Sequence, residues 1–295
     1  MNSQKSHVQR KNNQKREYRV PLTIIFVIFF LFSLTLLFPL LWLLYNAVKD
    51  KVEFFLNPWN FPQSFWANLK NFGVIFSEFG VGKMFFNSIF IAVLSPIISI
   101  FFTACAAYAY ARHTFKTKPL LYIVAMIPMV VSVAGTEPAT YRLVNNLGIY
   151  DSLPGMLLLS TGGFGFNFLL LVSVFVNISG AYKEAAQIDG AGNWRIFLTI
   201  YLPQASGILS VLMILGFIGA WNDYTMPYLY LPSHETLATG IYTLSQSITG
   251  SNSEYSNDYP KLFAAMIVSI MPVLVLFIAF QDKIMHFSLG GGVKG

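Results

Sequence analysis

The stretch "EAAQIDGAGNWRIFLTIYLP", residues 184–203, separates two long apolar runs and decides how the chain is organised. Its first part consists of strong helix formers, whereas Gly190 breaks or bends a helix because glycine loses much conformational freedom there. Pro203 suits the first turn of a following helix, where its missing N–H costs nothing. The stretch also carries charges of both signs, so it predicts a polar, glycine-broken helical segment between two apolar segments.

The composition places that segment in a membrane protein. Of the 295 residues, 55% are hydrophobic and only 11% are charged, and the mean hydropathy is +0.57. Soluble domains are about 25% charged, and a β-barrel would show short alternating strands instead of long apolar runs. The sequence therefore predicts an all-α polytopic membrane protein.

Six stretches are apolar over the length of about 20 residues that a membrane-spanning helix needs. The first is too long for the core of a signal peptide and lacks a cleavage site after it, so we expect a retained first helix. We expect six transmembrane helices within residues 21–281, between a basic N-terminal tail (1–20) and a C-terminal tail (282–295). The expected spans are 22–45, 85–109, 120–141 with an interruption at Pro128, 155–178, 205–230 and 262–280.

The charge distribution gives the expected orientation. The net charge is +6, and six Lys or Arg residues lie in the first twenty positions, directly before an apolar run. This pattern is typical of a cytoplasmic anchor rather than of nucleic-acid binding, because positive charge stays on the inner side of a membrane. With the tail inside, thirteen of the 19 Lys and Arg residues fall on the inner side and six on the outer side. We therefore expect cytoplasmic termini and an inner loop at residues 179–204.

The chain shows no pattern of an enzyme, a metal site or a bound cofactor. It lacks the P-loop motif that cradles ATP phosphates, and it lacks H-E-x-x-H and G-x-S-x-G. Its four histidines lie far apart, and its one cysteine excludes a disulfide within the chain. The small residues of "GGFGF" (162–166) and around Cys105 suit close helix packing instead. We expect no catalytic and no metal-binding residues.

The inner loop has two interpretations from its residues alone. It is either an interfacial helix that lies on lipid or a docking helix for a cytoplasmic protein. Interfacial helices favour Lys and Arg on their polar face, whereas Lys183 and Arg195 are balanced here by Glu184 and Asp189. The balance favours the docking helix.

The same loop resembles the EAA signature of ABC-importer permeases, which has EAA, a glycine soon after it, and a hydrophobic-x-Leu-Pro end. The triplet Asp189-Gly190-Ala191 is typical of carbohydrate-type members. The resemblance covers nearly the whole chain in the right order, and it points to the smaller membrane subunit of maltose-type sugar importers. The matching loop residues are Glu184, Ala185, Ala186, Gly190, Ile200, Leu202 and Pro203, and the other matching segments are "FFNSIFIAV", "AAYAYARHTFKTK", "GAWNDYTMP" and "LGGGVKG".

The resemblance implies the ABC type I importer permease fold, in a multi-pass protein of the bacterial cell membrane with a cytoplasmic coupling helix. It implies a second homologous permease subunit, two copies of an ABC ATPase that hold ATP and Mg, and an extracellular solute-binding protein that delivers a sugar, with oligosaccharides favoured. The chain itself would bind no cofactor. The residues expected to couple it to the ATPase are Glu184, Ala185, Ala186, Asp189, Gly190, Ala191 and Pro203.

Two other functions remain open. One is an ABC permease for a non-sugar solute such as a peptide, polyamine or phosphate, and the other is a stand-alone membrane enzyme. The Asp-Gly-Ala triplet and the Val-Lys-Gly end argue against the first, and the absence of a nucleophile with a base argues against the second. The chain departs from the family at Ser179-Gly180, where Ile-Pro is frequent, and at Asp223, where glutamate is commoner.

Polar residues within spans are costly and usually face a cavity or a partner. Aromatic, amide and carboxylate groups suit the ring face and the hydroxyls of a sugar. The same groups could hold helices together, Glu137 could pair with Arg142, and the larger partner subunit could carry most sugar contacts. The candidates for the substrate path are Glu137, Tyr141, Asn167, Trp221, Asn222, Asp223 and Tyr224.

Overall fold

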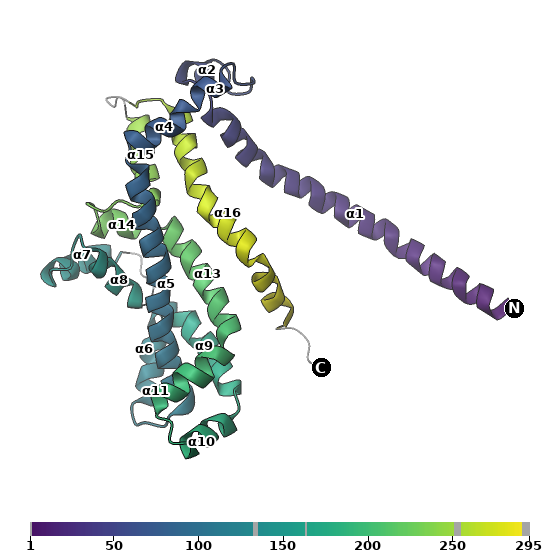
Figure 1. The fold of residues 1–295 in the computed structure, drawn as a ribbon, viewed down its shortest axis with the longest axis vertical. Coiled ribbons are helices and arrows are strands. Elements are labelled where there is room, and N and C mark those ends of the chain that lie inside the picture. The colour runs from purple at the N-terminus through teal and green to yellow at the C-terminus, as the bar shows by residue number, and fades with distance from the viewer. Residues whose placement is uncertain (1, 132–134, 163, 251–254, 291–295) are drawn as a thin grey trace. The chain divides into compact units, whose positions relative to one another are not determined.

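The structure is a computed structural model that describes residues 2–131, 135–162, 164–250 and 255–290. In these ranges every regular element is a helix and no strand occurs, which confirms the all-α prediction (Figure 1). In chain order the elements are α1 (Asn2–Ala47), α2 (Lys51–Leu56), α3 (Phe65–Asn68), α4 (Lys70–Ser77), α5 (Val81–Arg112), α6 (Lys118–Val130), α7 (Glu137–Asn146), α8 (Leu153–Leu159), η1 (Ser160–Gly162), α9 (Gly165–Asn177), α10 (Gly180–Ile188), α11 (Asn193–Ile196), η2 (Phe197–Tyr201), α12 (Leu202–Gln204), α13 (Ser206–Asn222), α14 (Thr225–Tyr230), α15 (Leu237–Thr249) and α16 (Tyr259–Gly290).

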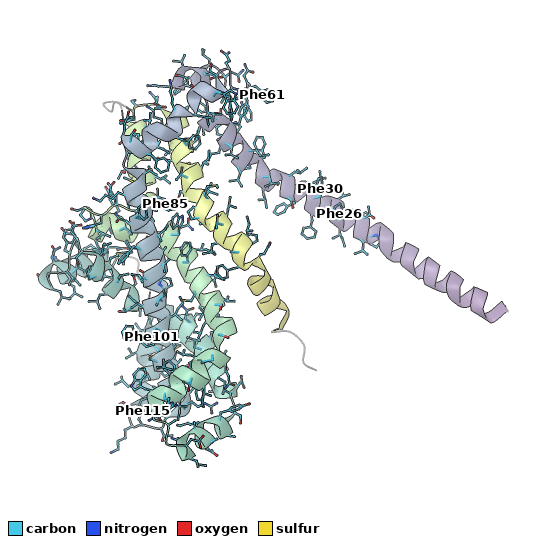
Figure 2. All side chains as sticks on the ribbon, viewed as in Figure 1. Phe26, Phe30, Phe61, Phe85, Phe101 and Phe115 are labelled. Carbon is cyan, nitrogen blue, oxygen red and sulfur yellow. The ribbon has the colours of Figure 1, made fainter. Side chains whose placement is uncertain are left out.

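The membrane-spanning helices follow the predicted apolar runs. Three described helices are long and apolar enough to cross a membrane, namely Pro21–Ala47, Val81–Arg112 and Tyr259–Gln281. Two strongly bent helix pairs raise this number to as many as five, and the apolar helix Lys118–Val130 is shorter. Large side chains such as Phe26 and Phe30 on α1 are 67% and 52% exposed, as expected for a surface that contacts lipid (Figure 2).

Three predicted spans are discontinuous, and only the break in the third was expected, at Pro128. In the third, α6 ends at Val130, after Pro128 within it, and the polar helix α7 starts separately at Glu137. The fourth is divided into α8, η1 and α9. The fifth is interrupted at Asp223, between α13 and α14. Breaks of this kind expose backbone groups, so each of them has to find polar partners within the protein.

The chain divides into two compact units, Met1–Gly73 with Asn257–Ile267, and Val74–Ser256 with Val268–Gly295. In the first unit, the loop after α1 is held by polar contacts of buried side chains. The Lys49 ammonium is fully buried and donates to the carbonyls of Asn57 and Pro58 at 3.2 and 3.0 Å. The amide of Asn71 donates to the carbonyls of Ala47 and Lys49, each at 2.9 Å. These bonds satisfy backbone carbonyls where helices end.

The second unit is built around α5, which packs on α13 and α9 (Figure 1). Small residues of α5 such as Ala104 and Ala107 are completely buried, as the small-residue pattern around Cys105 predicted. They allow α5 to approach a core of larger side chains that α9, the inner loop and α13 supply. These include Phe168, Leu171, Phe175, Ile196, Phe197, Tyr201, Ile208 and Leu212.

The contact between α5 and α13 depends on Gly216. A Cβ atom at Gly216 would lie 2.6 Å from Cβ of Pro96, which is closer than carbon atoms can pack. We predict that Gly216→Leu destabilises the protein by about 1–3 kcal/mol, because the rigid proline ring cannot yield. Thermal unfolding of the purified chain in detergent measures this. Gly219→Leu is the matched control, since nothing lies within 4 Å of a Cβ there. Equal unfolding temperatures for the two variants would contradict the packing argument.

Candidate functional site

The inner loop begins with α10, whose two ends are capped by local residues. The Ser179 hydroxyl accepts a hydrogen bond from the N–H of Ala181 at 3.4 Å. At the other end, Gly190 has φ +77°, its N–H donates to the Gln187 carbonyl at 3.0 Å, and the Ala191 N–H donates to the Ala186 carbonyl at 2.8 Å. This is a Schellman motif, which requires a left-handed residue at the Gly190 position. The predicted glycine break is therefore a defined corner.

A second helical piece follows the corner. Gly192 is extended, with φ −72° and ψ 160°, and α11, η2 and α12 continue without a gap to Gln204. Pro203 lies in the first turn of α12 rather than in that of α13. The bend between α9 and α10 is 69°, and the bend between Asn193–Gln204 and α13 is 79°. The loop is thus two short helices that leave the long helices at steep angles, in Figure 1 at the opposite end of α5 from α15.

Some of the expected coupling residues are exposed on the surface, and others pack against the core. Glu184, Ala185, Asp189, Gly190 and Pro203 are exposed. Ala186 and Ala191 are half-buried and pack against the core, so their small size serves the contact with the chain's own helices.

Apolar side chains also point outward from the loop. Ile188 is 87% exposed and Trp194 is 62% exposed. On α10, Ile188 lies one helical turn after Glu184 and Ala185, so these three exposed side chains share one side of the helix, which we call the docking face. Exposed apolar groups among charged ones are typical of an interaction surface.

The joint between the loop and the long helices is made by two basic residues, each of which donates to carbonyls at the end of another helix. Arg112, the last residue of α5, donates from its guanidinium to the carbonyls of Val176, at 3.2 Å, and Ile178, at the C-terminal end of α9. In return Lys183 of α10 donates to the Arg112 carbonyl at 2.9 Å. Carbonyls in the last turn of a helix lack intrahelical partners and attract positive charge. The two caps therefore tie α5, α9 and α10 together.

Aromatic rings surround this joint. The Arg112 guanidinium lies 5.1 Å from the ring of Tyr201, which lies 4.8 Å from the ring of Tyr108. Burial and the positive charge of Lys183 both hold the pKa of His113 below its usual value, so its imidazole is neutral at pH 7. The positive charge of the joint therefore comes from Arg112 and Lys183.

The substrate-path candidates of the fifth span have different surroundings. Trp221 is buried, and its indole N–H donates to the Ser269 carbonyl at 3.0 Å, so this side chain packs α13 against α16. The exposed Asn222 amide donates to the Ile218 carbonyl at 2.8 Å. Asp223 accepts hydrogen bonds from the N–H groups of Thr225 and Met226 at 2.9 and 3.2 Å, and thereby caps α14.

Asp223 also lines a cavity of about 190 Å³ with three serine residues that sequence reasoning did not single out. Ser95 and Ser99 come from the middle of α5, and Ser160 comes from η1. The hydroxyls of Ser95 and Ser160 are 2.9 Å apart and form a hydrogen bond. Hydroxyls at this depth of a span are costly unless they bond each other or line a polar path.

The remaining candidates lie on other elements. Glu137 and Tyr141 are on α7, and the Glu137 carbonyl accepts a hydrogen bond from the hydroxyl of Tyr230 at 3.2 Å. No ion pair joins Glu137 to Arg142 in the part of the chain that the structure describes. Asn167 is half-buried in the first turn of α9. Four candidates therefore lie together at the end of α13 and the break after it, from Trp221 to Tyr224, whereas α7 carries Glu137 and Tyr141 and α9 carries Asn167.

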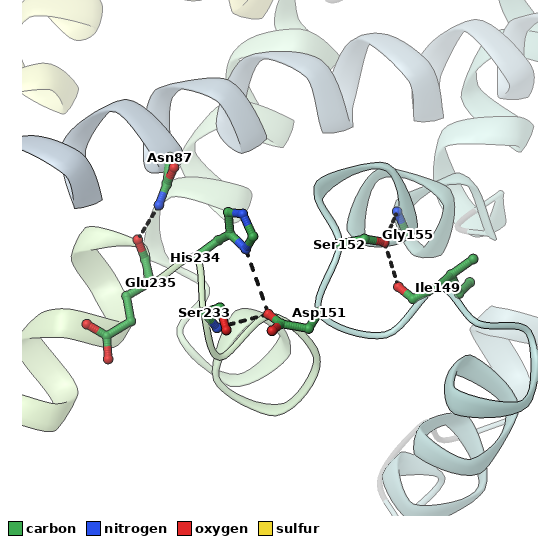
Figure 3. A network of polar contacts seen from close by, with 8 residues as sticks. All are labelled: Asn87, Ile149, Asp151, Ser152, Gly155, Ser233, His234 and Glu235. Carbon is green, nitrogen blue, oxygen red and sulfur yellow. Dashed lines mark hydrogen bonds and ion pairs between the residues drawn. The ribbon is translucent and has the colours of Figure 1, made fainter.

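A polar network fixes the segment between α14 and α15 (Figure 3). The carboxylate of Asp151 accepts from the N–H of Ser233 at 2.9 Å and lies 3.8 Å from Nδ1 of His234. The hydrogen bonds from Ser233 hold the pKa of Asp151 below its usual value. At the start of α5, Asn87 donates to the Glu235 carbonyl at 3.0 Å. The segment is thereby attached both to α5 and to the turn before α8.

Comparisons with known proteins agree with the motif and the fold. No protein-family model matches the chain. The chain is 29% identical to the diacetylchitobiose uptake system permease protein NgcG of Streptomyces coelicolor, over 86% of this chain and 83% of that protein. It is 26% identical to the arabinooligosaccharides transport system permease protein AraQ of Bacillus subtilis, over 97% and 99%. It is 25% identical to the probable ABC transporter permease protein YurM of the same species, over 98% and 94%.

A solved structure shows the same fold. It is a bacterial ABC transporter involved in the import of the acidic polysaccharide alginate, with a TM-score of 0.74 and 23% identity over 90% of this chain and 96% of that one. The chain is therefore a multi-pass α-helical membrane protein with an ABC-importer permease fold. The comparisons confirm the predicted resemblance to carbohydrate-type ABC permeases, whose named members are transport subunits rather than enzymes.

The hydrogen bonds from Arg112 to the end of α9 lead to a prediction. Arg112→Ala removes a charged donor from two carbonyls, so we expect a loss of stability of about 1.5–3 kcal/mol and faster hydrogen exchange at Ile178–Lys183. Hydrogen exchange and thermal unfolding of the purified chain measure both effects. Lys116→Ala is the control, since Lys116 is exposed in the turn after α5. The joint would have no role if the two variants exchanged at the same rate.

Proposed function

We propose that this chain is the transmembrane permease subunit of an ABC importer that takes up an oligosaccharide from an extracellular binding protein. ATP is hydrolysed by a separate subunit that docks on residues 179–204. The observation that carries the proposal is the loop itself. Glu184 and Ala185 of the EAA motif lie on an exposed docking face, and the corner at Gly190 and the joint at Arg112 connect that face to the long helices. An interfacial helix on lipid would need neither the corner at Gly190 nor the joint at Arg112.

The geometry suggests how a cytoplasmic motor moves the permease. In this proposal an ATPase that binds to Glu184 and Ile188 displaces α10. Because Lys183 of α10 caps α5, and Arg112 of α5 caps α9, the displacement reaches α5 and then α9. Buried α5 residues such as Ala104 pack on the core that includes α13, so the helices move as packed bodies and not by bending. The cavity between the two permease subunits then opens to alternate sides.

The partners follow from the same proposal. A second, homologous permease subunit completes the membrane part, and two copies of an ABC ATPase hold ATP and Mg on the cytoplasmic side. Residues 1–20 and 282–295 are cytoplasmic tails around the permease domain (21–281), although residues 291–295 of the second lie outside the described residues. An oligosaccharide is favoured because relatives are named for diacetylchitobiose, for arabinooligosaccharides, and for melibiose, raffinose and stachyose.

Cysteine labelling tests the orientation. The chain has one cysteine, Cys105, so a Cys105→Ala background makes a new cysteine unique. We expect a membrane-impermeant maleimide to label Asn60→Cys on intact cells, and Glu184→Cys only after permeabilisation. Both native residues are exposed. Assembly with the ATPase should then protect Glu184→Cys but not Asn60→Cys. Labelling of Glu184→Cys from outside, or no protection by the ATPase, would refute the proposal.

A substitution at Gly190 tests whether the loop couples ATP hydrolysis to transport. A β-branched residue at φ +77° costs roughly 1–2 kcal/mol, so Gly190→Val should tilt α10 against α11. We predict that uptake and sugar-stimulated ATP hydrolysis fall about tenfold while the ATPase still co-purifies. Gly192→Val is the matched control, because Gly192 has an ordinary φ of −72° and open space around its Cβ position. Similar uptake by both variants would show that the corner is not used.

A further inference from the structure

Two aromatic side chains in the loop between α2 and α3 pack along α1. The ring of Trp59 stacks on Phe38 with centroids 6.2 Å apart, and it lies 6.0 Å from the ring of Trp42. The ring of Phe61 meets Tyr45 edge-on at 5.5 Å. Phe38, Trp42 and Tyr45 are spaced by four and three residues, so they lie along one side of the helix. The loop therefore runs back along the last turns of α1.

These contacts place the loop at the depth of the membrane surface. The span within α1 ends at Ala47, and Phe38 and Trp42 precede that residue by nine and five positions. At a rise of 1.5 Å per residue they lie about 14 and 8 Å before the helix end. The span of 27 residues is about 40 Å long, roughly 10 Å longer than the hydrocarbon core is thick. With the helix centred in the bilayer, Trp59 lies just within the edge of the hydrocarbon core.

Both rings of the loop keep most of their surface exposed. Phe61 is 86% exposed beside the end of α1, and Trp59 is 66% exposed (Figure 2). Residues 21–41 of α1 are all exposed as well, so the two rings continue the surface of α1 that contacts lipid. Tryptophan is enriched at the level of the lipid headgroups, because its ring is apolar and its N–H is polar. This continuity favours phospholipid over a protein as the partner of the two rings.

The polar residues of the same segment line a cavity that the two rings do not line. The cavity has a volume of about 440 Å³, and its lining includes the carboxylates of Asp50 and Glu53 and the amides of Asn57, Asn60 and Gln63. Carboxylates are costly in lipid, so this side of the segment belongs in water. The segment therefore has one polar side and one aromatic side.

The backbone before the rings is fully hydrogen-bonded, as non-helical backbone close to hydrocarbon must be. The Asn57 N–H donates to a carbonyl of α2, and the Asn57 and Pro58 carbonyls accept from the Lys49 ammonium. Pro58 has no N–H to satisfy. The Trp59 N–H donates to the Asn57 side chain, and the Trp59 carbonyl accepts from the Tyr45 hydroxyl, each at 2.9 Å. From Asn57 to Trp59 the loop needs no water to satisfy its backbone.

We propose that Trp59 and Phe61 form an aromatic anchor that inserts into the headgroup boundary of the outer leaflet, with the phospholipid bilayer as its partner. The anchor fixes the depth of α1, whose residues 21–41 pack against no core of the chain's described residues. The choice of leaflet rests on the proposed function and its orientation, whereas the insertion itself does not.

Spin labelling of the whole importer measures the depth of the loop. The importer carries Cys105→Ala, is expressed with its partner subunits and is placed in nanodiscs of phosphatidylcholine and phosphatidylglycerol. A nitroxide on Phe61→Cys should relax several-fold more with oxygen, which dissolves in lipid, than with a water-soluble nickel chelate. Asn60→Cys is the matched control, because the neighbouring Asn60 lines the polar cavity. Its label should respond mainly to nickel.

Each other outcome is decisive. Relaxation mainly by nickel at both positions would place the loop in water and overturn the anchor. Poor access of both reagents to the label on Phe61→Cys would mean that a protein covers this position, and would also overturn the anchor. If the label on Phe61→Cys lies in lipid but an impermeant maleimide reaches Asn60→Cys only after permeabilisation, the anchor holds and the proposed orientation is wrong.

Fluorescence quenching tests Trp59 without a new cysteine. Lipids brominated near the top of their acyl chains quench indole rings that they contact. We expect Trp59→Phe, which keeps a ring against Phe38, to lower the lipid-quenched share of the tryptophan fluorescence of the importer. Trp221→Phe is the control and should not lower this share, because Trp221 is buried. Equal quenching of the wild type and Trp59→Phe would contradict the insertion of Trp59.

Discussion

The structure depends on one constraint, which is that carbonyls at the ends of membrane helices must find donors. Where α5 and α9 end, side by side, this need is met by the guanidinium of Arg112 and the ammonium of Lys183. Each residue belongs to one helix and caps another, so three helix ends become a single joint. Since hydrogen bonds to charged groups are the stronger ones, the joint is stiff at the place where an inner loop meets the helices. The mechanical part of the proposed function is a consequence of this arrangement.

The same need for polar partners explains the part of the second unit that holds α14 and α15. The break at Asp223 frees the first N–H groups of α14, and the carboxylate of Asp223 accepts two of them. The segment before α15 is held by Asn87, Ser88 and Asp151, which bond its backbone. As a result α14 and α15 are each held by hydrogen bonds to other segments of the second unit. A membrane protein that transports a polar solute needs such rigid polar corners, because its lipid-facing surfaces offer no hydrogen bonds.

Packing between the long helices uses small residues and fixed shapes. Gly216 against Pro96, and Gly240 against Met84, bring α13 and α15 close to α5. Ala104 and Ala107 do the same for the core around Phe175 and Tyr201. Such contacts have few alternative arrangements, so the proposed displacement of α10 would move these helices as packed bodies.

The sequence by itself determined the class of protein, the course of the apolar runs and the place of the helical corner. Hydropathy depends on composition over about 20 residues, and the corner depends on a glycine with its local hydrogen bonds, so both are readable along the chain. The tertiary structure decided which polar residues meet. Trp221 packs against the Ser269 carbonyl, Ser95 bonds Ser160, and Tyr242 stacks on Tyr224 across intervals that no periodicity encodes. Arg112 and Lys183 form a joint only because the ends of α5 and α9 lie together, and contacts distant in sequence are fixed by packing alone.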